Sequence, residues 1–219
     1  MRTKIIVIIA NSQLKNSAFN KKLIKQADII ICADGGANKI APLKITPHYL
    51  IGDMDSVKKS VLRQLTATTK IIIDHRQHNT DLEKAILFAE TLHPSEIKIL
   101  GALGNNLDHT IANVISLHHV CKKLKISILD EQHTIFLLND NSVKISGKRG
   151  DIISVIPIAH VHGLSYQGLK WSVKNKKVST GWCGVRNQMI ANKALISLKK
   201  GKALVIKIMP ARSTYTART

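Results

Sequence analysis

Asp53 and Asp55 are the residues of this chain best suited to chemistry, because two carboxylates two residues apart follow a short apolar run at 47–51. That run is typical of a buried strand, and the end of a strand in an open α/β sheet is where ligands tend to bind. Mg²⁺ prefers oxygen ligands and commonly keeps water and substrate phosphates in its shell. The same residues could form a simple turn, since Gly, Asp and Ser are ordinary turn and cap residues.

Two further acids stand at expected ends of strands or starts of helices. Asp34, Gly35 and Gly36 follow the apolar run at 28–33. Paired glycines let a backbone approach a phosphate or nucleobase closely, although Gly-Gly is also a common turn. Asp81 opens a helical pattern, where a helix N-terminus attracts anions and a bridging cation, or where the residue could serve as the helix cap.

A glycine-rich segment at 101–109 has the same organisation. An expected strand runs into a turn that contains Gly104, and Asp108 and His109 follow at the start of a helical pattern. This indicates an anion or nucleotide site, but it is neither a Walker loop nor the dinucleotide-binding GxGxxG pattern. His109 could instead be a helix-start histidine that bonds the backbone.

Strands and helices alternate through residue 129, which predicts a mostly parallel, doubly wound sheet. The predicted strands are 4–10, 28–33, 48–51, 70–73 and 97–100, and the predicted helices are 14–26, 57–65, 82–92 and 110–123. From residue 134 the pattern changes to short alternating strands between turns rich in Asn, Asp, Gly and Lys, which predicts an antiparallel β-sandwich. These strands are 134–138, 142–145, 152–157, 161–166, 178–180, 194–198 and 203–208. We therefore predict an α/β plus all-β protein with a Rossmann-like domain at 1–133 and a β-sandwich domain at 134–219.

The charge of the chain is concentrated in its second half. The formal net charge is +19, and residues 142–219 carry 15 of the 33 Lys and Arg residues with Asp151 as their one acid. Such a surface would suit nucleic acid, an anionic small substrate, or solubility alone. No basic stripe with interleaved aromatic residues is present, and aromatic residues make up 4% of the chain, so we do not expect nucleic acid to be the main partner.

The remaining composition indicates a cytoplasmic protein. The apolar runs are of strand length, too short for a membrane span or the core of a signal peptide. Cys32, Cys121 and Cys183 are odd in number and widely spaced, so we interpret them as free thiols in a reducing compartment.

With these motifs in this order, the chain resembles the thiamine pyrophosphokinase family nearly from end to end. The resemblance is carried by the segments 33–38, 52–56, 80–83, 100–113 and 168–171. It implies transfer of a diphosphoryl group from ATP to the hydroxyl of thiamine, giving thiamine diphosphate and AMP. It also implies a homodimer with a Rossmann-like domain and a β-sandwich domain in each subunit, and thiamine bound at the subunit interface.

The resemblance implies roles for single residues of the first domain. Asp53, Asp55 and Asp81 match the acids that hold Mg²⁺ and orient the phosphates of ATP, and Asp108 matches an acid beside the reacting groups. The residues assigned to the nucleotide side are Asp34, Gly35, Gly36 and Gly104. Phosphoryl chemistry depends mainly on positioning and charge neutralisation, which agrees with a set of this kind.

In the second domain the resemblance points to two residues. Trp171 matches the aromatic residue on which the pyrimidine ring of thiamine packs, and Asn187 matches a polar contact to that ring. Trp171 could also be a core residue of the sandwich. The site at the interface would combine these residues with the carboxylates of the other subunit.

The chain departs from the family pattern in three places. His78 stands where many members have an acid, Asn105 and Asn106 stand where a Gly-Arg pair is usual, and Arg186 replaces a common serine. These changes bear on rate, metal stoichiometry and thiamine affinity. Two other interpretations are a non-catalytic nucleotide- or thiamine-binding protein, and a nucleic-acid-binding protein that uses the basic half. The retained acids favour the enzyme.

Overall fold

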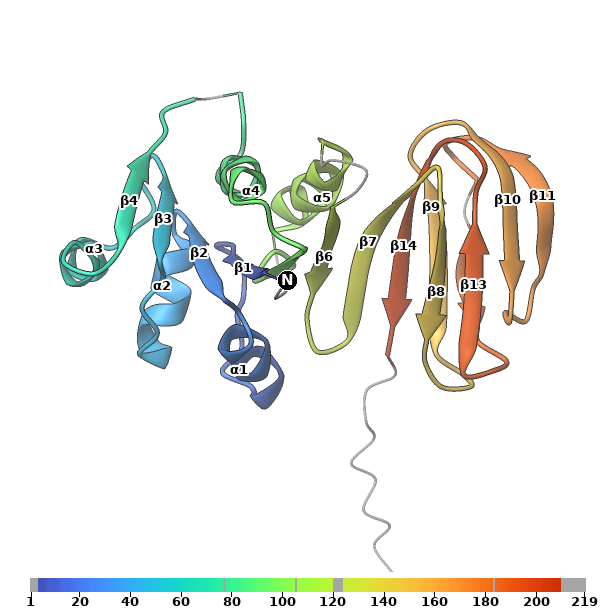
Figure 1. Cartoon of the computed structure of the whole chain (residues 1–219), viewed down its shortest axis with the longest axis horizontal. Coiled ribbons are helices and arrows are strands. Elements are labelled where there is room, and N and C mark those ends of the chain that lie inside the picture. Colours follow the sequence, from blue (N-terminus) through green and yellow to red (C-terminus); the bar gives the residue numbers. More distant parts are fainter. Residues whose placement is uncertain (1–3, 77, 105, 120–123, 183, 210–219) are drawn as a thin grey trace, which may run out of the picture. The chain divides into compact units, whose positions relative to one another are not determined.

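The computed structural model describes residues 4–76, 78–104, 106–119, 124–182 and 184–209 of the chain (Figure 1). The chain divides into two compact units, one ending at Glu131 and the other starting at Gln132. Three residues singled out in the sequence, Asn105, Cys121 and Cys183, lie outside the described residues. In the described part of the chain, no helix is both long enough and apolar enough to cross a membrane.

The first unit is an open parallel sheet. Its described strands are β1 (Ile5–Ile9), β2 (Ile29–Ala33), β3 (Tyr49–Gly52), β4 (Lys70–Ile73), β5 (Glu96–Leu100) and β6 (Lys125–Leu129). They lie in the order β6-β5-β1-β2-β3-β4, and each neighbouring pair is parallel. The chain therefore winds in one direction from β1 to β4 and then returns to place β5 on the other side of β1. Ligands of open α/β sheets bind at such a reversal of strand order.

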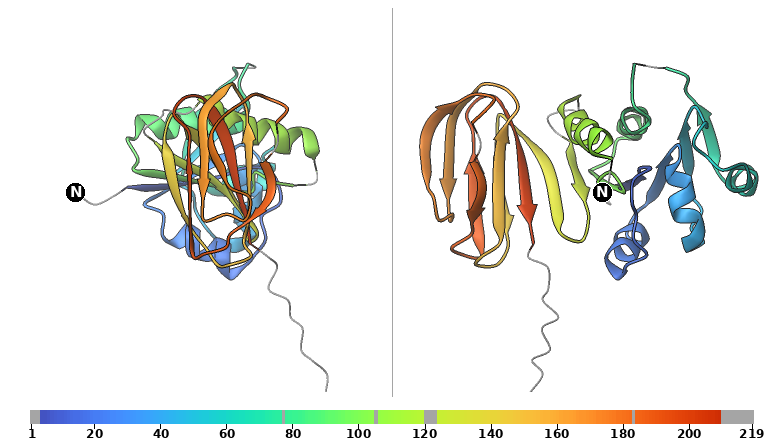
Figure 2. Two further views of the ribbon diagram at one scale, coloured as in Figure 1. Left: turned by 90° about the vertical axis from the view of Figure 1, so that its right-hand side faces the viewer. Right: turned by 180° about the vertical axis from the view of Figure 1, so that it is seen from behind.

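Helices cover both faces of this sheet, as Figures 1 and 2 show. They are α1 (Ala18–Lys25), α2 (Gly36–Ile40), α3 (Lys59–Leu65), α4 (Asp81–Thr91) and α5 (Leu107–Ile115), with 3₁₀ turns at η1 (Ala41–Leu43) and η2 (Ser116–His119). One face of the sheet, with Val7 and Ile9 of β1, packs in a common core with Ile24 of α1, Ile40 of α2 and Val61 of α3. Because strand side chains alternate between faces, Ile6 and Ile8 point to the opposite face, which α4 covers.

Local capping explains where two of these helices begin. The Ser17 side chain accepts a hydrogen bond from the Asn20 backbone, so α1 starts at Ala18, later than the residue 14 expected from periodicity. Thr80 and Glu83 form a reciprocal capping box that starts α4 at Asp81. Such a box satisfies two backbone N–H groups that would otherwise be unpaired at the start of the helix. Capping thus fixes the position of Asp81.

The second unit consists, in its described residues, of two antiparallel sheets. Its strands are β7 (His133–Asn139), β8 (Ser142–Ser146), β9 (Ile152–Pro157), β10 (Val161–Gln167), β11 (Val173–Val178), β12 (Gly184–Gln188), β13 (Lys193–Ser197) and β14 (Lys202–Ile208). One sheet has the order β12-β9-β14-β7 and the other β11-β10-β13-β8. Buried residues of both, including Val155 of β9 and Ile196 of β13, share one core. The predicted fold class is confirmed.

Two edge strands of the second unit differ from the sequence prediction. Strand β11 covers 173–178 and not 178–180, and β12 at 184–188 was not predicted. The four central residues of β11 are all polar and exposed, and Asn187 is the one buried residue of β12. Both strands form through backbone pairing to β10 and β9 without a continuous apolar face, so hydrophobic alternation could not reveal them. Lysines on β11 also oppose pairing of this edge with other chains.

Candidate functional site

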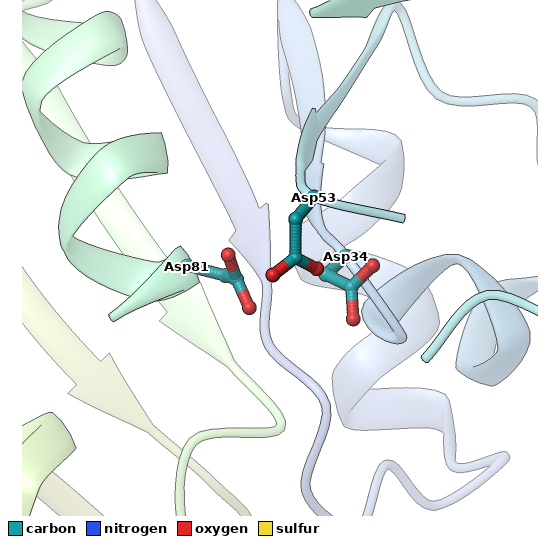
Figure 3. Close-up of side chains that lie close together, drawn as sticks. All are labelled: Asp34, Asp53 and Asp81. Atoms are coloured by element: carbon teal, nitrogen blue, oxygen red, sulfur yellow. The ribbon is translucent and has the colours of Figure 1, made fainter. Parts of the chain in front are cut away.

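Three aspartates from three segments meet at the carboxyl edge of the parallel sheet. Asp34 follows β2, Asp53 follows β3, and Asp81 is the first residue of α4. Their carboxylate oxygens lie within 4.8 Å of one another, and Figure 3 shows the three side chains gathered between α4 and the ends of the two strands. Because β2 and β3 are parallel neighbours, the residues that follow them are brought side by side.

The backbone around this group allows an unusually close approach. Asp34 has a φ of 42°, in the left-handed region, which Asp adopts more readily than most residues. Gly52 has a φ of 151°, and a Cβ at that position would lie 2.8 Å from the Cβ of Asp34 and 3.2 Å from Oδ1 of Asp81. A side chain at residue 52 would therefore push two of the three acids apart, which explains why glycine precedes Asp53.

Asp34 is an acid in an environment that does not favour a negative charge. Its side chain is nearly fully buried, and its Oδ1 has no hydrogen-bond partner among the described residues. Burial raises the pKa of Asp34, with a smaller contribution from the nearby Asp81 and Asp55. Hydrogen bonds from the Gly35 backbone and the Ser56 side chain oppose this increase in pKa, and the Ser56 backbone N–H also donates to Oδ2 of Asp34. A hard cation would supply the partner that Oδ1 lacks, so the donor set fits Mg²⁺.

A buried lysine holds Asp81 in place. Lys84, one turn along α4, is only 4% exposed, and its Nζ lies 2.9 Å from Oδ1 of Asp81. Lysine is almost never fully buried unless it is paired, and this pair provides a positive charge beside the acidic group. Lys84 was not among the residues predicted from the sequence. The spacing from Asp81 by three residues, on the apolar face of a helix, could have revealed it.

Asp55, which the sequence placed with Asp53 and Asp81, lies next to this group and not in it. Its side chain is exposed, and its Oδ1 accepts a hydrogen bond of 2.8 Å from Oγ of Ser56. Its backbone N–H donates to Oδ1 of Asp53 over 3.2 Å. The described acids that could share one ion are thus Asp34, Asp53 and Asp81, and Asp55 supports the loop that carries Asp53.

A cleft of about 590 Å³ opens over two of these acids, Asp34 and Asp81. It is lined by Asp34 and Asp81, by the loop after β1, and by Gly104 and His109 of the glycine-rich segment. That loop comprises Asn11, Ser12 and Gln13. Oγ1 of Thr110 fixes Gly104 by accepting from its N–H over 3.1 Å and donating to its carbonyl over 3.2 Å. Residues from the ends of β1, β2 and β5 thus meet at the reversal of strand order.

The other first-unit residues singled out by sequence lie around the cleft. Asp108 is exposed on the first turn of α5, beside His109. Gly35 and Gly36 are buried where α2 starts, and a Cβ on Gly36 would lie 2.1 Å from the carbonyl oxygen of Ile9. Here glycine lets α2 pack closely against β1. His78 is exposed in the loop before α4, and Asn106 is exposed at the N-cap of α5.

Trp171 and Asn187 form a distinct feature of the second unit. Trp171 is 56% exposed in the turn between β10 and β11, so it is not a core residue. Asn187 is 5% exposed and holds that turn. Its Oδ1 accepts from the Trp171 N–H over 3.0 Å, and its Nδ2 donates to the Trp171 carbonyl over 2.7 Å. The structure therefore shows Asn187 as the support of an exposed aromatic ring.

The same turn carries cationic side chains. The ammonium group of Lys170 lies 5.2 Å from the centre of the Trp171 ring, within the range of a cation–π contact. Arg186 is exposed, and its left-handed φ of 57° marks the irregularity in the pairing of β12 with β9. Oγ of Ser154 accepts a 3.0 Å hydrogen bond from the Arg186 backbone and stabilises this conformation.

The fold and the cleft define a class of two-domain protein, in which an α/β unit with an acidic ligand cleft is followed by a β-sandwich. Comparison with known sequences places the chain more narrowly. Residues 20–129 match the pattern described as "Thiamin pyrophosphokinase, catalytic domain", and residues 133–203 match "Thiamin pyrophosphokinase, vitamin B1 binding domain". The chain belongs to the thiamin pyrophosphokinase family.

Individual relatives agree with this assignment. Thiamine pyrophosphokinase 1 of Arabidopsis thaliana is 31% identical over 207 residues, which cover 82% of this chain and 76% of that protein. Thiamine pyrophosphokinase of Bacillus subtilis is 27% identical over 184 residues, covering 81% and 86% of the two chains. The crystal structure of the Bacillus subtilis protein matches the fold with a TM-score of 0.83 over 95% of this chain and 100% of that chain, at 24% identity. The resemblance inferred from sequence, and the prediction that the chain is an enzyme of this family, are confirmed.

The geometry of the acids predicts unequal effects of two similar substitutions. Asp34→Asn removes a charge from the group of three, so we expect Mn²⁺ affinity to fall at least ~10-fold, because ligand charge largely sets affinity at an oxygen site. Asp55→Asn removes an equally negative but exposed group, and we expect a loss of less than ~3-fold because solvent screens it. Titration of each purified variant with Mn²⁺, followed by electron paramagnetic resonance, measures both. Equal losses, or a larger loss for Asp55→Asn, would contradict the assignment of Asp34.

Proposed function

We propose that this protein transfers the terminal diphosphoryl group of ATP to the hydroxyl of thiamine, producing thiamine diphosphate and AMP. In this step the thiamine oxygen forms a bond to the β-phosphorus, and the bond from that phosphorus to the oxygen bridging to the α-phosphorus breaks. The hydroxyl proton leaves to a base, and AMP departs with the bridging oxygen. The observation that carries this proposal is the convergence of three carboxylates, two of which line the cleft, in a chain matched to both domains of the family.

The unpartnered oxygen of Asp34 supports a divalent cation at the cleft. Asp34, Asp53 and Asp81 would hold it. Bound Mg²⁺ would neutralise phosphate charge, which is a main requirement of phosphoryl transfer. The two exposed neighbours, Asp55 and Asp108, are candidates to accept the hydroxyl proton.

The surrounding backbone would position the nucleotide. Gly104, fixed by Thr110, brings the main chain to the edge of the cleft. Because glycine has no side chain, the backbone there could closely approach a phosphate or the ribose. Lys84 would keep Asp81 oriented and offset the repulsion among the acids before ATP binds. Positioning of this kind accounts for much of the rate enhancement expected of such enzymes.

Thiamine would bind on the exposed ring of Trp171, which Asn187 holds in place. We propose a homodimer in which this ring serves the carboxylates of the other subunit. Two sets of exposed apolar residues support a partner surface. One set lies along α5 at four-residue spacing and consists of Leu107, Ile111 and Ile115; the other set is Trp171, Val185 and Ile190. Exposed apolar residues grouped in this way commonly mark interaction surfaces.

The proposed reaction predicts a defined product ratio. Purified protein with ATP, Mg²⁺ and thiamine should release one AMP for each thiamine consumed, without ADP, because the bond broken lies between the α- and β-phosphates. Chromatography of the nucleotides, with a reaction lacking thiamine as the control, measures this directly. ADP as the product would indicate transfer of a single phosphoryl group, and binding of ATP without AMP release would indicate a non-catalytic nucleotide-binding protein.

The proposed thiamine site predicts a separation of the two substrates. Trp171→Ala should raise the KM for thiamine at least ~3-fold and leave the KM for ATP unchanged, because stacking on an aromatic ring is lost. Ser172→Ala, in the same exposed turn, is the matched control and should change neither constant.

Mixing two variant chains tests whether the thiamine site is formed by residues of both subunits. Chains carrying Trp171→Ala and chains carrying Asp34→Asn should regain activity when their subunits exchange, because one of the two sites in each mixed dimer is intact. An unchanged KM for thiamine in Trp171→Ala would remove Trp171 from the site. No recovery after demonstrated subunit exchange would contradict a site shared between subunits.

A further inference from the structure

A second, smaller cleft of about 220 Å³ adjoins the acidic one in the first unit. It is lined by the chain after β1, by the glycine-rich turn after β5, and by the end of β6 with the two acids that follow. The two clefts share Gln13 and Gly104. They thus follow one another along the carboxyl edge of the sheet, across the reversal of strand order between β1 and β5.

Two hydrogen-bond acceptors at this cleft lack partners. Oδ1 of Asn20 and Oε1 of Glu131 are buried without a hydrogen bond in the described part of the chain. Nδ2 of Asn20 donates to the Lys15 carbonyl over 3.0 Å, which sets the orientation of the amide. Oε2 of Glu131 lies 3.7 Å from Nζ of Lys15, which leaves Oε1 as the free oxygen. Buried acceptors are nearly always paired in folded proteins, so two unpaired ones at one cleft indicate a ligand that donates.

The remaining lining restricts the shape of that ligand. Leu14, Leu103 and Leu129 supply apolar surface, which suits a ring. The volume is below the ~300–1,000 Å³ common for whole ligands, so the cleft would hold part of a larger molecule that continues into the acidic cleft. Two adjacent carboxylates, Asp130 and Glu131, oppose a phosphate here despite the presence of Lys15.

We propose that this second cleft binds the adenine ring of ATP and selects it through its exocyclic amine. The inference rests on the proposed function, which supplies ATP and places its phosphates in the adjoining cleft. Asn20 and Glu131 would accept the two hydrogens of the amine, and the leucines would contact the ring. Glu131 and Asn20 are then residues that determine nucleotide specificity, a role for which no sequence motif pointed to them.

The backbone between the two clefts supports a nucleotide that extends from one cleft into the other. Gly101 has a φ of 66°, and a Cβ there would lie 2.8 Å from the Ala10 carbonyl oxygen. A Cβ on Gly104 would lie 3.0 Å from the Cβ of Ser12. The glycines thus allow the turn after β5 to lie directly on the loop after β1, where the sugar of a bound nucleotide would pass.

The test compares ATP with inosine triphosphate, which has an oxo group in place of the amine. Calorimetric titration in the presence of Mg²⁺ should show wild-type protein binding ATP at least ~10-fold more tightly, because an oxo group would face two buried acceptors. Glu131→Gln can present an amide N–H₂ to that oxo group, so its preference should fall to below ~3-fold. Glu96→Gln removes a carboxylate of the same unit that lines neither cleft, and should keep the wild-type preference.

Two further measurements keep the outcome unambiguous. Inorganic tripolyphosphate, which has no base, should bind wild type and Glu131→Gln equally. Leu103→Trp, which fills the space proposed for the ring, should weaken ATP binding at least ~10-fold and leave tripolyphosphate binding unchanged. This variant replaces Glu131→Gln in the test if Glu131→Gln does not fold. Equal wild-type affinity for ATP and inosine triphosphate, or identical preferences in Glu131→Gln and Glu96→Gln, would overturn the adenine assignment while AMP formation could still stand. Failure to bind either triphosphate or tripolyphosphate would overturn the proposed function and this inference together.

Discussion

The close approach of three carboxylates, whose oxygens lie within 4.8 Å of one another, is the constraint that the segments around the cleft must satisfy. Burial is the main cause that disfavours the ionised form of Asp34, and the nearby charges of Asp81 and Asp55 add to it. Several features of the chain offset that cost. Lys84 pairs with Asp81, the Ser56 N–H bonds Asp34, and Gly52 removes the steric obstacle between them. A cation bound only by the folded form would add stability to the whole unit by linkage.

The general architecture, and part of the group of three acids, could be predicted from the sequence. Apolar, β-branched runs revealed β1 to β5, and the change to short alternating strands revealed the sandwich. Asp53 and Asp81 follow from local patterns, because a strand end and a capping box are encoded by neighbouring residues. Asp34 joins the other two acids only because β2 and β3 are adjacent in the sheet. Local sequence patterns do not reveal which strands are adjacent. Local spacing favoured Asp55 instead, because it cannot show which side of a loop faces the cleft.

The second unit was harder to predict for a different reason. Its core strands carry alternating apolar residues, whereas β11 and β12 are edge strands formed by backbone pairing. Asn187 lies on one of these strands, and its burial against Trp171 could not be inferred from a polar sequence. The same holds for Asn20 and Glu131 in the first unit, which are 111 positions apart in the sequence and come together only in the fold. Buried polar residues that are brought together from distant segments are thus less visible in sequence than acids that follow a strand.

The position of a bound metal ion tests the assignment of the three acids most directly. Crystals of the protein with Mn²⁺ and a non-hydrolysable ATP analogue would locate the ion through its anomalous scattering. We expect a peak within bonding distance of oxygens from Asp34, Asp53 and Asp81, with phosphate oxygens completing the shell. A peak bound by Asp55 without Asp34, or none near the three acids when the analogue is in place, would contradict it.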